Sequence, residues 1–198
     1  MKILELFCGT KSFIKIAEEQ GHECITLDFD KKFNPTICCD ILKFDISMLK
    51  GFKPDFIWAS PPCTTFSVAS IGKHWNKDGT PKTNEAVTGL AILEKTKSII
   101  EELKPKYWII ENPRGMMRKW LPSEFRTTVT YCQYGDTRMK PTDLWNNFGF
   151  KGKCCKNKSP CHISATRGSK TGTKGIKGAT ARGIITPNLC SEILEVIK

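Results

Sequence analysis

The sequence predicts an α/β fold built on a doubly wound, mostly parallel sheet. Short apolar runs alternate along the chain with longer helical patterns, an alternation typical of parallel βα units. Turn residues, carboxylates or a thiol directly follow five of these runs. Because ligands of such sheets bind beyond the carboxyl ends of the strands, the residues at these ends are candidates for a functional site.

One helix separates the first strands of the predicted sheet. The apolar run at residues 2–7 forms the first strand, and residues 8–10 form a turn. Ser12 then caps a helix that stops before Gly21. Three further strands are expected at residues 23–27, 36–39 and 55–59.

A long helix and two more strands follow. Residues 84–104 carry apolar side chains on roughly one side and are followed by Pro105, so this segment predicts a helix. The apolar positions are Ala86, Leu90, Leu93, Ile99, Ile100 and Leu103. A polar loop at residues 68–83 precedes it. The remaining elements are strands at 107–110 and 127–133, a short helix near 115–120 and a closing helix at 188–197.

Length and composition indicate a single globular domain over residues 1–198. A chain of 198 residues buries a hydrophobic core without the help of disulfides. No apolar run approaches the roughly 20 residues of a membrane span, and Glu5 interrupts the only candidate for a signal segment. We expect no membrane association and a cytoplasmic location, in the host cytoplasm if the source is a virus.

The net charge of +11 is concentrated in one segment. Residues 144–191 hold nine basic residues, no acidic residue and seven of the 15 glycines. This composition predicts a loop or a mobile arm rather than a helix. The segment is either a solvated tail or a surface that contacts the phosphate backbone of a nucleic acid. Its candidate contacts are Arg167, Lys170, Lys174 and Lys177.

Ten cysteines, in a chain with no secretion signal, do not indicate a disulfide framework. One local group has the ligand types that zinc prefers: Cys154, Cys155, Cys161 and His162. Its spacing matches no CxxC pair, and adjacent cysteines seldom bind one metal ion. The prediction is therefore no metal, with zinc at these four residues as the alternative.

A glycine turn and two aspartates suggest a nucleoside-containing cofactor. Gly9 lies in a turn that leads into a helix, where backbone N–H groups attract anions. Asp28 ends the next expected strand and is placed to accept from ribose hydroxyls, while Asp40 is placed to accept from an adenine amino group. The alternative is an ordinary strand–helix turn with solvated aspartates.

Cys63 is the candidate nucleophile. It follows two prolines at the end of an apolar strand, so its side chain projects from a stiff backbone. Glu111 ends the neighbouring strand, and the pair suits a thiolate beside a protonated carboxyl. The alternative is a packed structural cysteine.

These motifs, in this order, resemble the cytosine-C5 DNA methyltransferase family. The similar segments are LELFCGT, SPPCTTFS, ENPRG, YCQYGDTRMK and RGIITPNLCSEI. The resemblance implies a Rossmann-like class I methyltransferase fold and S-adenosylmethionine as the cofactor. SPPC also resembles the SPPY motif of amino-methyltransferases, but a cysteine in the tyrosine position favours transfer to C5.

The resemblance implies roles for individual residues. The implied catalytic residues are Cys63, Glu111, Arg138 and Lys140. The implied cofactor-binding residues are Phe7, Cys8, Gly9, Thr10, Asp28, Phe29, Asp40, Ile41, Pro61 and Asn188. The expected nucleic-acid contacts outside the basic arm are Lys73, Lys77 and Arg114. The 68–83 loop is either a lid over a bound base or a mobile surface loop.

The predicted activity is methyl transfer to C5 of cytosine in DNA through a covalent Cys63 adduct. Residues 131–140 (YCQYGDTRMK) are called the YG segment below. Family members carry a target-recognition domain after the corresponding segment, and here only residues 144–191 stand in its place. Two alternatives therefore stay open: the same chemistry on RNA or a free cytosine nucleotide, and a non-catalytic nucleic-acid-binding module. A separate protein that supplies sequence specificity is a further expectation.

Overall fold

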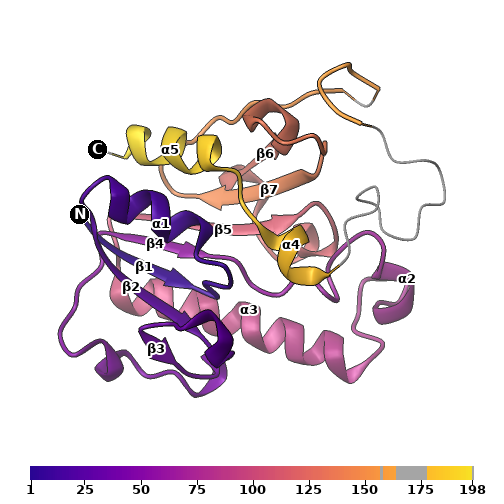
Figure 1. Cartoon of the computed structure of the whole chain (residues 1–198). Helices are drawn as coiled ribbons and strands as arrows, with labels where there is room; N and C mark the ends of the chain where they lie inside the picture. Colours follow the sequence, from indigo (N-terminus) through magenta and orange to yellow (C-terminus); the bar gives the residue numbers. More distant parts are fainter. Residues whose placement is uncertain (157, 164–177, 198) are drawn as a thin grey trace.

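A computed structural model of the chain describes residues 1–156, 158–163 and 178–197 (Figure 1). The strands are β1 (Lys2–Leu6), β2 (Glu23–Asp28), β3 (Ile37–Cys38), β4 (Phe56–Ala59), β5 (Tyr107–Pro113), β6 (Arg126–Thr130) and β7 (Pro141–Asn146). The α-helices are α1 (Ser12–Glu19), α2 (Ile71–His74), α3 (Asn84–Leu103), α4 (Ala179–Gly183) and α5 (Pro187–Val196).

The strands form one seven-stranded sheet in the order β3-β2-β1-β4-β5-β7-β6. The first five strands of that order are parallel, while β7 runs antiparallel to both β5 and β6. The predicted mostly parallel, doubly wound sheet is confirmed. The strand order reverses between β1 and β4, which is where an open sheet of this kind forms its ligand crevice.

Helices cover both faces of the sheet. Alternating side chains of β4 show the arrangement, because Ile57 packs into the core under α3 and Trp58 into the core under α1 and α5. Figure 1 shows α3 on one side of the sheet and α1 with α5 on the other. Trp58 stacks on Phe13 of α1 with ring centroids 4.4 Å apart. Burial of side chains this large stabilises the sandwich by about 1.5–3 kcal/mol each.

The expected strand at 127–133 is wrong in its second half. β6 ends at Thr130, and Tyr131–Tyr134 form a 3₁₀ helix. The sequence prediction also missed β7, because this strand begins with a proline and carries Asp143 in its middle. Arg118 neutralises this buried carboxylate through two hydrogen bonds of 2.6 Å, so the strand tolerates the charge.

The 68–83 segment is fixed to the core at its middle. Trp75 is buried, and its ring nitrogen donates to the backbone oxygen of Thr65 at 2.8 Å. A β-bridge joins Trp75 to Pro81, and α2 lies just before them. Closure of the whole segment over a base would pull Trp75 out of the core, which makes a lid formed by the whole segment unfavourable.

The basic segment at 144–191 contains regular structure where it is described. Its first residues belong to β7, and α4 occupies 179–183, where a loop was expected. That expectation is wrong at α4, because five residues are enough for one helical turn even beside glycines. Within 1–156, 158–163 and 178–197, no helix combines the length and apolarity that a bilayer crossing needs.

Candidate active site

The turn after β1 holds Asp28 at the cofactor end of the sheet. One carboxylate oxygen of Asp28 accepts from the backbone N–H of Gly9 at 2.9 Å, and the other accepts from Asp30 at 2.9 Å. Gly9 has a φ of 46°, a left-handed conformation that costs glycine little. Each Asp28 oxygen keeps a second lone pair, so the carboxylate remains able to accept from hydroxyls.

A hollow opens beside this turn, between the ends of β1, β2 and β4. Four of the expected cofactor residues line it: Phe7, Phe29, Asp40 and Ile41. Phe29 is 71% exposed beside this hollow, so its side chain is accessible to a ligand. An aromatic face with a carboxylate next to it suits a flat heteroaromatic ring that carries an amino group. The residues present therefore fit a nucleoside.

The other expected cofactor residues lie around this hollow with different roles. Pro61 is buried, and it is Pro62 that lines the hollow. Burial raises the pKa of the Cys8 thiol to about 12, so this thiol stays neutral. Thr10 follows Gly9 in the turn. Asn188 is exposed beside Gly135, where a side chain added to the glycine would meet its amide nitrogen at 3.2 Å.

The loop that carries Cys63 is held from two sides. The Asn112 side chain, fully buried at the end of β5, donates to the backbone oxygen of Pro61 at 2.8 Å. Downstream, Ser67 forms a β-bridge with Gly115, and Met116 donates its N–H to Phe66 at 2.7 Å. These contacts fix both ends of the loop while Cys63 itself stays exposed at its tip.

Glu111 lies buried at the end of β5, 6% exposed. Tyr131 donates its hydroxyl hydrogen to the Glu111 carboxylate at 3.4 Å. Burial raises the pKa of Glu111, while the positive charge of Lys140 opposes this shift. A carboxyl group with a raised pKa retains its proton closer to neutral pH, as a general acid must.

Lys140 faces the same carboxylate. Its ammonium group lies 4.2 Å from the centre of the Tyr131 ring, a cation–π contact. Burial lowers the pKa of Lys140, the negative charge of Glu111 opposes this, and Arg138 adds to the lowering. Lys140 therefore supplies a positive charge in a poorly hydrated position next to the candidate acid.

Arg138 is clamped by Asp136 and keeps one donor unused. The guanidinium donates from Nε to both Asp136 oxygens at 2.9 Å, and Nη2 also pairs with that carboxylate. Nη1 is buried and has no hydrogen-bond partner among the described residues. A buried donor without a partner costs free energy, which an acceptor on a bound substrate would recover.

The thiol of Cys63 responds to this group of charges. Partial withdrawal from water raises the pKa of Cys63, and the negative charge of Glu111 raises it further. Lys140 and Arg182, the latter in α4, act in the opposite direction. Charged groups on β5, in the YG segment and on α4 therefore act on the thiol that follows β4, and the sequence had assigned the first two to the same site.

Comparisons with known proteins agree on one family. A family model described as C-5 cytosine-specific DNA methylase matches residues 1–132. A protein of Frog virus 3 (isolate Goorha), named a probable DNA (cytosine-5)-methyltransferase, is 34% identical over 222 aligned residues that cover 99% of this chain and 100% of that protein. The chain belongs to the C-5 cytosine-specific DNA methylase family.

More distant relatives of this methylase are longer. The type II methyltransferase M.SacI of Streptomyces achromogenes is 27% identical over 126 residues, which are 59% of this chain and 31% of that protein. A solved structure, a putative DNA modification methyltransferase encoded within an E. coli prophage, has a TM-score of 0.53 and 17% identity. It matches 74% of this chain and 46% of its own, and its likeness concerns the fold alone. The predicted family, enzyme class and fold are confirmed.

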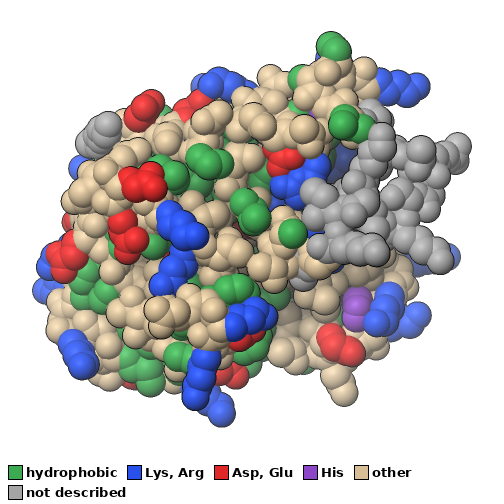
Figure 2. Space-filling model, in the orientation of Figure 1, with side chains coloured by type: hydrophobic (Ala, Val, Ile, Leu, Met, Phe, Trp, Pro, Cys, Tyr) green, Lys and Arg blue, Asp and Glu red, His purple; other side chains and the backbone are tan. Residues whose placement is uncertain are grey.

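The expected nucleic-acid contacts of the methylase divide into two groups. Lys73, Lys77 and Arg114 are exposed, and Lys73 lines a groove that runs past Pro62 and Thr64. The other four, Arg167, Lys170, Lys174 and Lys177, lie outside the described residues. On the described part of the face in Figure 2, basic and acidic side chains are interspersed.

Sequence reasoning missed several residues of this site. Asn112 positions the Cys63 loop, Tyr131 contacts Glu111, and Asp136 orients Arg138. All three belong to the ENPRG and YCQYGDTRMK segments, which were the available signal. The contact of Tyr131 depends on the pairing of β5, β7 and β6, which was not predicted, whereas Asp136 lies two residues from Arg138 and Asn112 reaches the loop after the neighbouring β4. Arg182 was missed because α4 was expected to be a loop.

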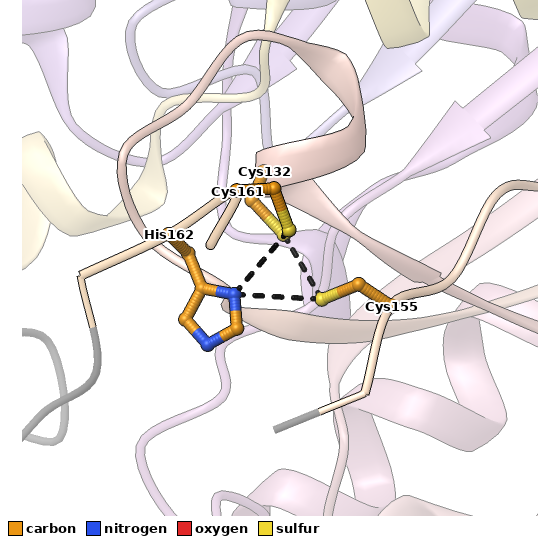
Figure 3. Close-up of side chains that lie close together, drawn as sticks. All are labelled: Cys132, Cys155, Cys161 and His162. Atoms are coloured by element: carbon orange, nitrogen blue, oxygen red, sulfur yellow. Dashed lines mark hydrogen bonds between the residues drawn. The ribbon is translucent and has the colours of Figure 1, made fainter. Parts of the chain in front are cut away.

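The structure brings together three of the four residues of the zinc alternative, with a different fourth residue. Cys154 is exposed and is not among the converging residues, whereas Cys132 lies within the group (Figure 3). The group is Cys132, Cys155, Cys161 and His162, whose ligand atoms all lie within 4.8 Å of one another. Cys132 was missed because it comes 23 residues before Cys155, in the 3₁₀ helix that follows β6.

Proposed function

We propose that this protein transfers a methyl group from S-adenosylmethionine to C5 of cytosine in DNA through a covalent adduct on Cys63. The single observation that supports this best is the set of Cys63, Glu111 and Arg138, whose charges all act on Lys140. An exposed thiol, a buried carboxyl with raised pKa and an arginine with an unused donor belong to neighbouring strand ends. Each answers a different requirement of the reaction at a cytosine ring.

Cys63 provides the nucleophile. C5 of cytosine is a weak nucleophile, and addition of a thiolate to C6 converts it into an enamine-like carbon. Burial and Glu111 raise the pKa of Cys63, and the positive charges of Lys140 and Arg182 oppose this rise and so favour the thiolate. A protonated Glu111 removes the negative charge that would otherwise oppose it.

Glu111 and Arg138 stabilise the charge that the addition creates. As the C6–S bond forms, the electron pair of the C5–C6 bond shifts and negative charge develops at N3 and O2. Glu111 holds a proton for N3, and the free Nη1 of Arg138 donates to O2. Asp136 fixes the guanidinium for this task, because it occupies the other donors.

The hollow near Asp28 and Phe29 provides the cofactor site in this proposal. When bound, S-adenosylmethionine supplies an electrophilic methyl group that C5 accepts. Asp28 would bind the ribose hydroxyls, and Asp40 and Phe29 would contact the adenine ring. A base then removes the proton from C5, and the C6–S bond breaks to release the Cys63 thiolate.

The basic segment at 144–191 takes the place of a target-recognition domain. In duplex DNA the cytosine must leave the stack, at a cost of a few kcal/mol. Contacts from Lys and Arg side chains to phosphates offset that cost without reading sequence. The proposal therefore includes weak sequence selection, or a separate protein that supplies it.

The test is a substrate panel analysed by nucleoside mass spectrometry. The protein is incubated with labelled S-adenosylmethionine and duplex DNA, RNA or dCMP. We expect 5-methyl-2′-deoxycytidine from DNA, its loss in Cys63→Ala, and its retention in Cys154→Ala, which changes another exposed cysteine. Product from RNA or dCMP alone would show that one of these is the substrate in place of DNA. N4-methylcytosine as the product would reject the thiol mechanism. The absence of product from every substrate would overturn the proposed enzymatic function.

A further inference from the structure

We propose that Cys132, Cys155, Cys161 and His162 bind one structural Zn²⁺ ion (Figure 3). Three thiols and an imidazole form the Cys₃His ligand set of closed structural zinc sites. They come from two parts of the chain, the 3₁₀ helix after β6 and the segment at 155–162. The site lies outside the catalytic group, and the proposed methyl transfer does not require it.

The distances within the cluster fit tetrahedral coordination. With Zn–S bonds of about 2.3 Å and a Zn–N bond of about 2.0–2.1 Å, the edges of the tetrahedron are about 3.8 Å between sulfurs and about 3.5 Å from sulfur to nitrogen. The Cys132 and Cys161 sulfurs are 3.7 Å apart. Nδ1 of His162 lies 3.6 Å from Cys155 Sγ and 3.5 Å from Cys161 Sγ. Three edges therefore have the expected lengths.

A fourth distance, between the Cys132 and Cys155 sulfurs, distinguishes a metal site from a disulfide. The Cys132 and Cys155 sulfurs are 3.2 Å apart, shorter than a zinc tetrahedron edge but far longer than the roughly 2.05 Å of an S–S bond. A disulfide between Cys132 and Cys155 would also not explain why the ligand atoms of Cys161 and His162 lie next to these sulfurs. Convergence of all four ligand atoms is what a shared metal ion explains.

The orientation of His162 gives a second, independent indication. Its Nδ1 faces two sulfurs, as Figure 3 shows, and its Nε2 is buried without a hydrogen-bond partner among the described residues. With the proton on Nε2, the Nδ1 lone pair points into the cluster, where thiol hydrogens are weak donors. A zinc ion is the stronger partner for that lone pair and for three thiolates.

The cluster joins the YG segment to the basic segment. The N–H of Thr130 donates to Lys153 at 3.0 Å, and the N–H of Ile163 donates to Thr137 at 2.9 Å. Cys132 directly follows Tyr131, which contacts Glu111. A bound zinc ion would therefore fix the start of the basic segment against the strand end that carries the proposed catalytic residues. This consequence for catalysis rests on the proposed function, whereas the metal site does not.

The direct test is the metal content of the full-length protein, purified under reducing conditions and measured by inductively coupled plasma mass spectrometry. We expect one zinc per chain. Cys132→Ser, Cys161→Ser and His162→Ala should each lose it, while Cys154→Ser, which changes the exposed neighbour of a ligand, should keep it. Less than a tenth of an equivalent in the wild-type protein, a different stoichiometric metal, or loss of zinc in Cys154→Ser as well would overturn the proposal.

A measurement on the wild-type protein covers the case in which ligand variants do not fold. A chelator should release one zinc per chain and lower the Tm, and added Zn²⁺ should restore it. Co²⁺ in place of zinc should give the visible absorption of a tetrahedral cobalt–thiolate site. Alkylation and peptide mapping that reveal a disulfide among the three cysteines would contradict the site. Failure of methyl transfer in a protein that binds zinc would count against the proposed function alone.

Discussion

Among the side chains of the proposed site, Glu111 has the most narrowly defined chemical role. Its carboxyl is buried, its pKa is raised by that burial, and Tyr131 and Lys140 contact or face it. These features suit a group that holds a proton for N3 and then stabilises the adduct. The neutral form does the work, so replacing the carboxyl with an amide tests proton donation while leaving shape and burial nearly unchanged.

Glu111→Gln should lower kcat by about 10²–10⁴-fold, the usual contribution of a positioned general acid. Binding of S-adenosylmethionine, measured by calorimetry, should not change, because Glu111 does not line the cofactor hollow. Glu124→Gln, an exposed carboxylate after β5, serves as the matched control. A kcat within a few-fold of wild type for Glu111→Gln would remove the residue from the mechanism.

Glu5 is a second buried carboxyl, 2% exposed in the middle of β1. Burial raises its pKa well above the ordinary value, and one carboxyl oxygen has no partner among the described residues. The folded state thus prefers the protonated form. The stability from this group is complete below the pKa of an unfolded glutamate and declines as the pH rises through the higher folded pKa.

Glu5→Gln should therefore raise the Tm at about pH 8 more than at about pH 5, because the amide cannot ionise. Thermal unfolding followed by circular dichroism across this pH range checks the result. Glu19→Gln, an exposed glutamate of α1, should show no such difference. Equal changes in Tm at both pH values for Glu5→Gln would show that Glu5 does not titrate with folding.

At the level of elements, the Cys63 loop depends on its contact with the turn after β5. Gly115 forms a β-bridge with Ser67, and an added Cβ would lie 2.0 Å from the backbone oxygen of Phe66. Backbone atoms cannot retreat as a flexible side chain does. A side chain at this position must push the loop away from the strand end where Glu111 lies.

Gly115→Ala should destabilise the protein by about 1–3 kcal/mol, the typical cost of overpacking. It should also reduce kcat/KM, because the displaced loop carries Cys63. Gly72→Ala is the matched control, since a Cβ there meets nothing within 4 Å. Thermal unfolding and steady-state kinetics of both variants decide the point, and a Gly115→Ala protein as stable and active as Gly72→Ala would contradict it.

A comparison of the individual elements shows which parts of the fold and of the site could be predicted from the sequence. Residues at the ends of β1, β2, β4 and β5 were predicted correctly, because apolar strands with turn residues behind them leave a local pattern. β7 was missed because Asp143 is buried against Arg118, a tertiary contact with no local signal. Cys132 was missed for the same reason, since it joins its cluster only through the chain that returns beside Thr130.

At the scale of the whole molecule, the distribution of charge divides the chain into two parts. Residues 1–143 carry nearly balanced charge, while residues 144–191 carry nine basic and no acidic side chains. The described end of that segment includes Arg182, whose charge acts on Cys63. In the proposed function the segment binds phosphates beside the active site.

Neutralising three of its lysines should weaken DNA binding without affecting fold. The triple variant Lys170→Gln, Lys174→Gln and Lys177→Gln should reduce the slope of log K against log salt by about 0.9 for each phosphate that the segment no longer neutralises. The control changes Lys50, Lys53 and Lys104, exposed residues in the segments before β4 and β5, where these strands begin and opposite the strand ends that carry the proposed site. An unchanged salt dependence in the first triple variant would show that the segment does not bind the DNA backbone.

The central claim concerns a covalent bond between Cys63 and the target base, and trapping that bond tests it most directly. DNA that contains 5-fluorocytosine offers no C5 proton to remove after methyl transfer, so the thiol cannot be eliminated and the adduct persists. With S-adenosylmethionine present, we predict a denaturation-resistant protein–DNA adduct that peptide mapping assigns to Cys63, and none in Cys63→Ala. Methylation of ordinary DNA without any trapped adduct, or an adduct on a different residue, would contradict the account.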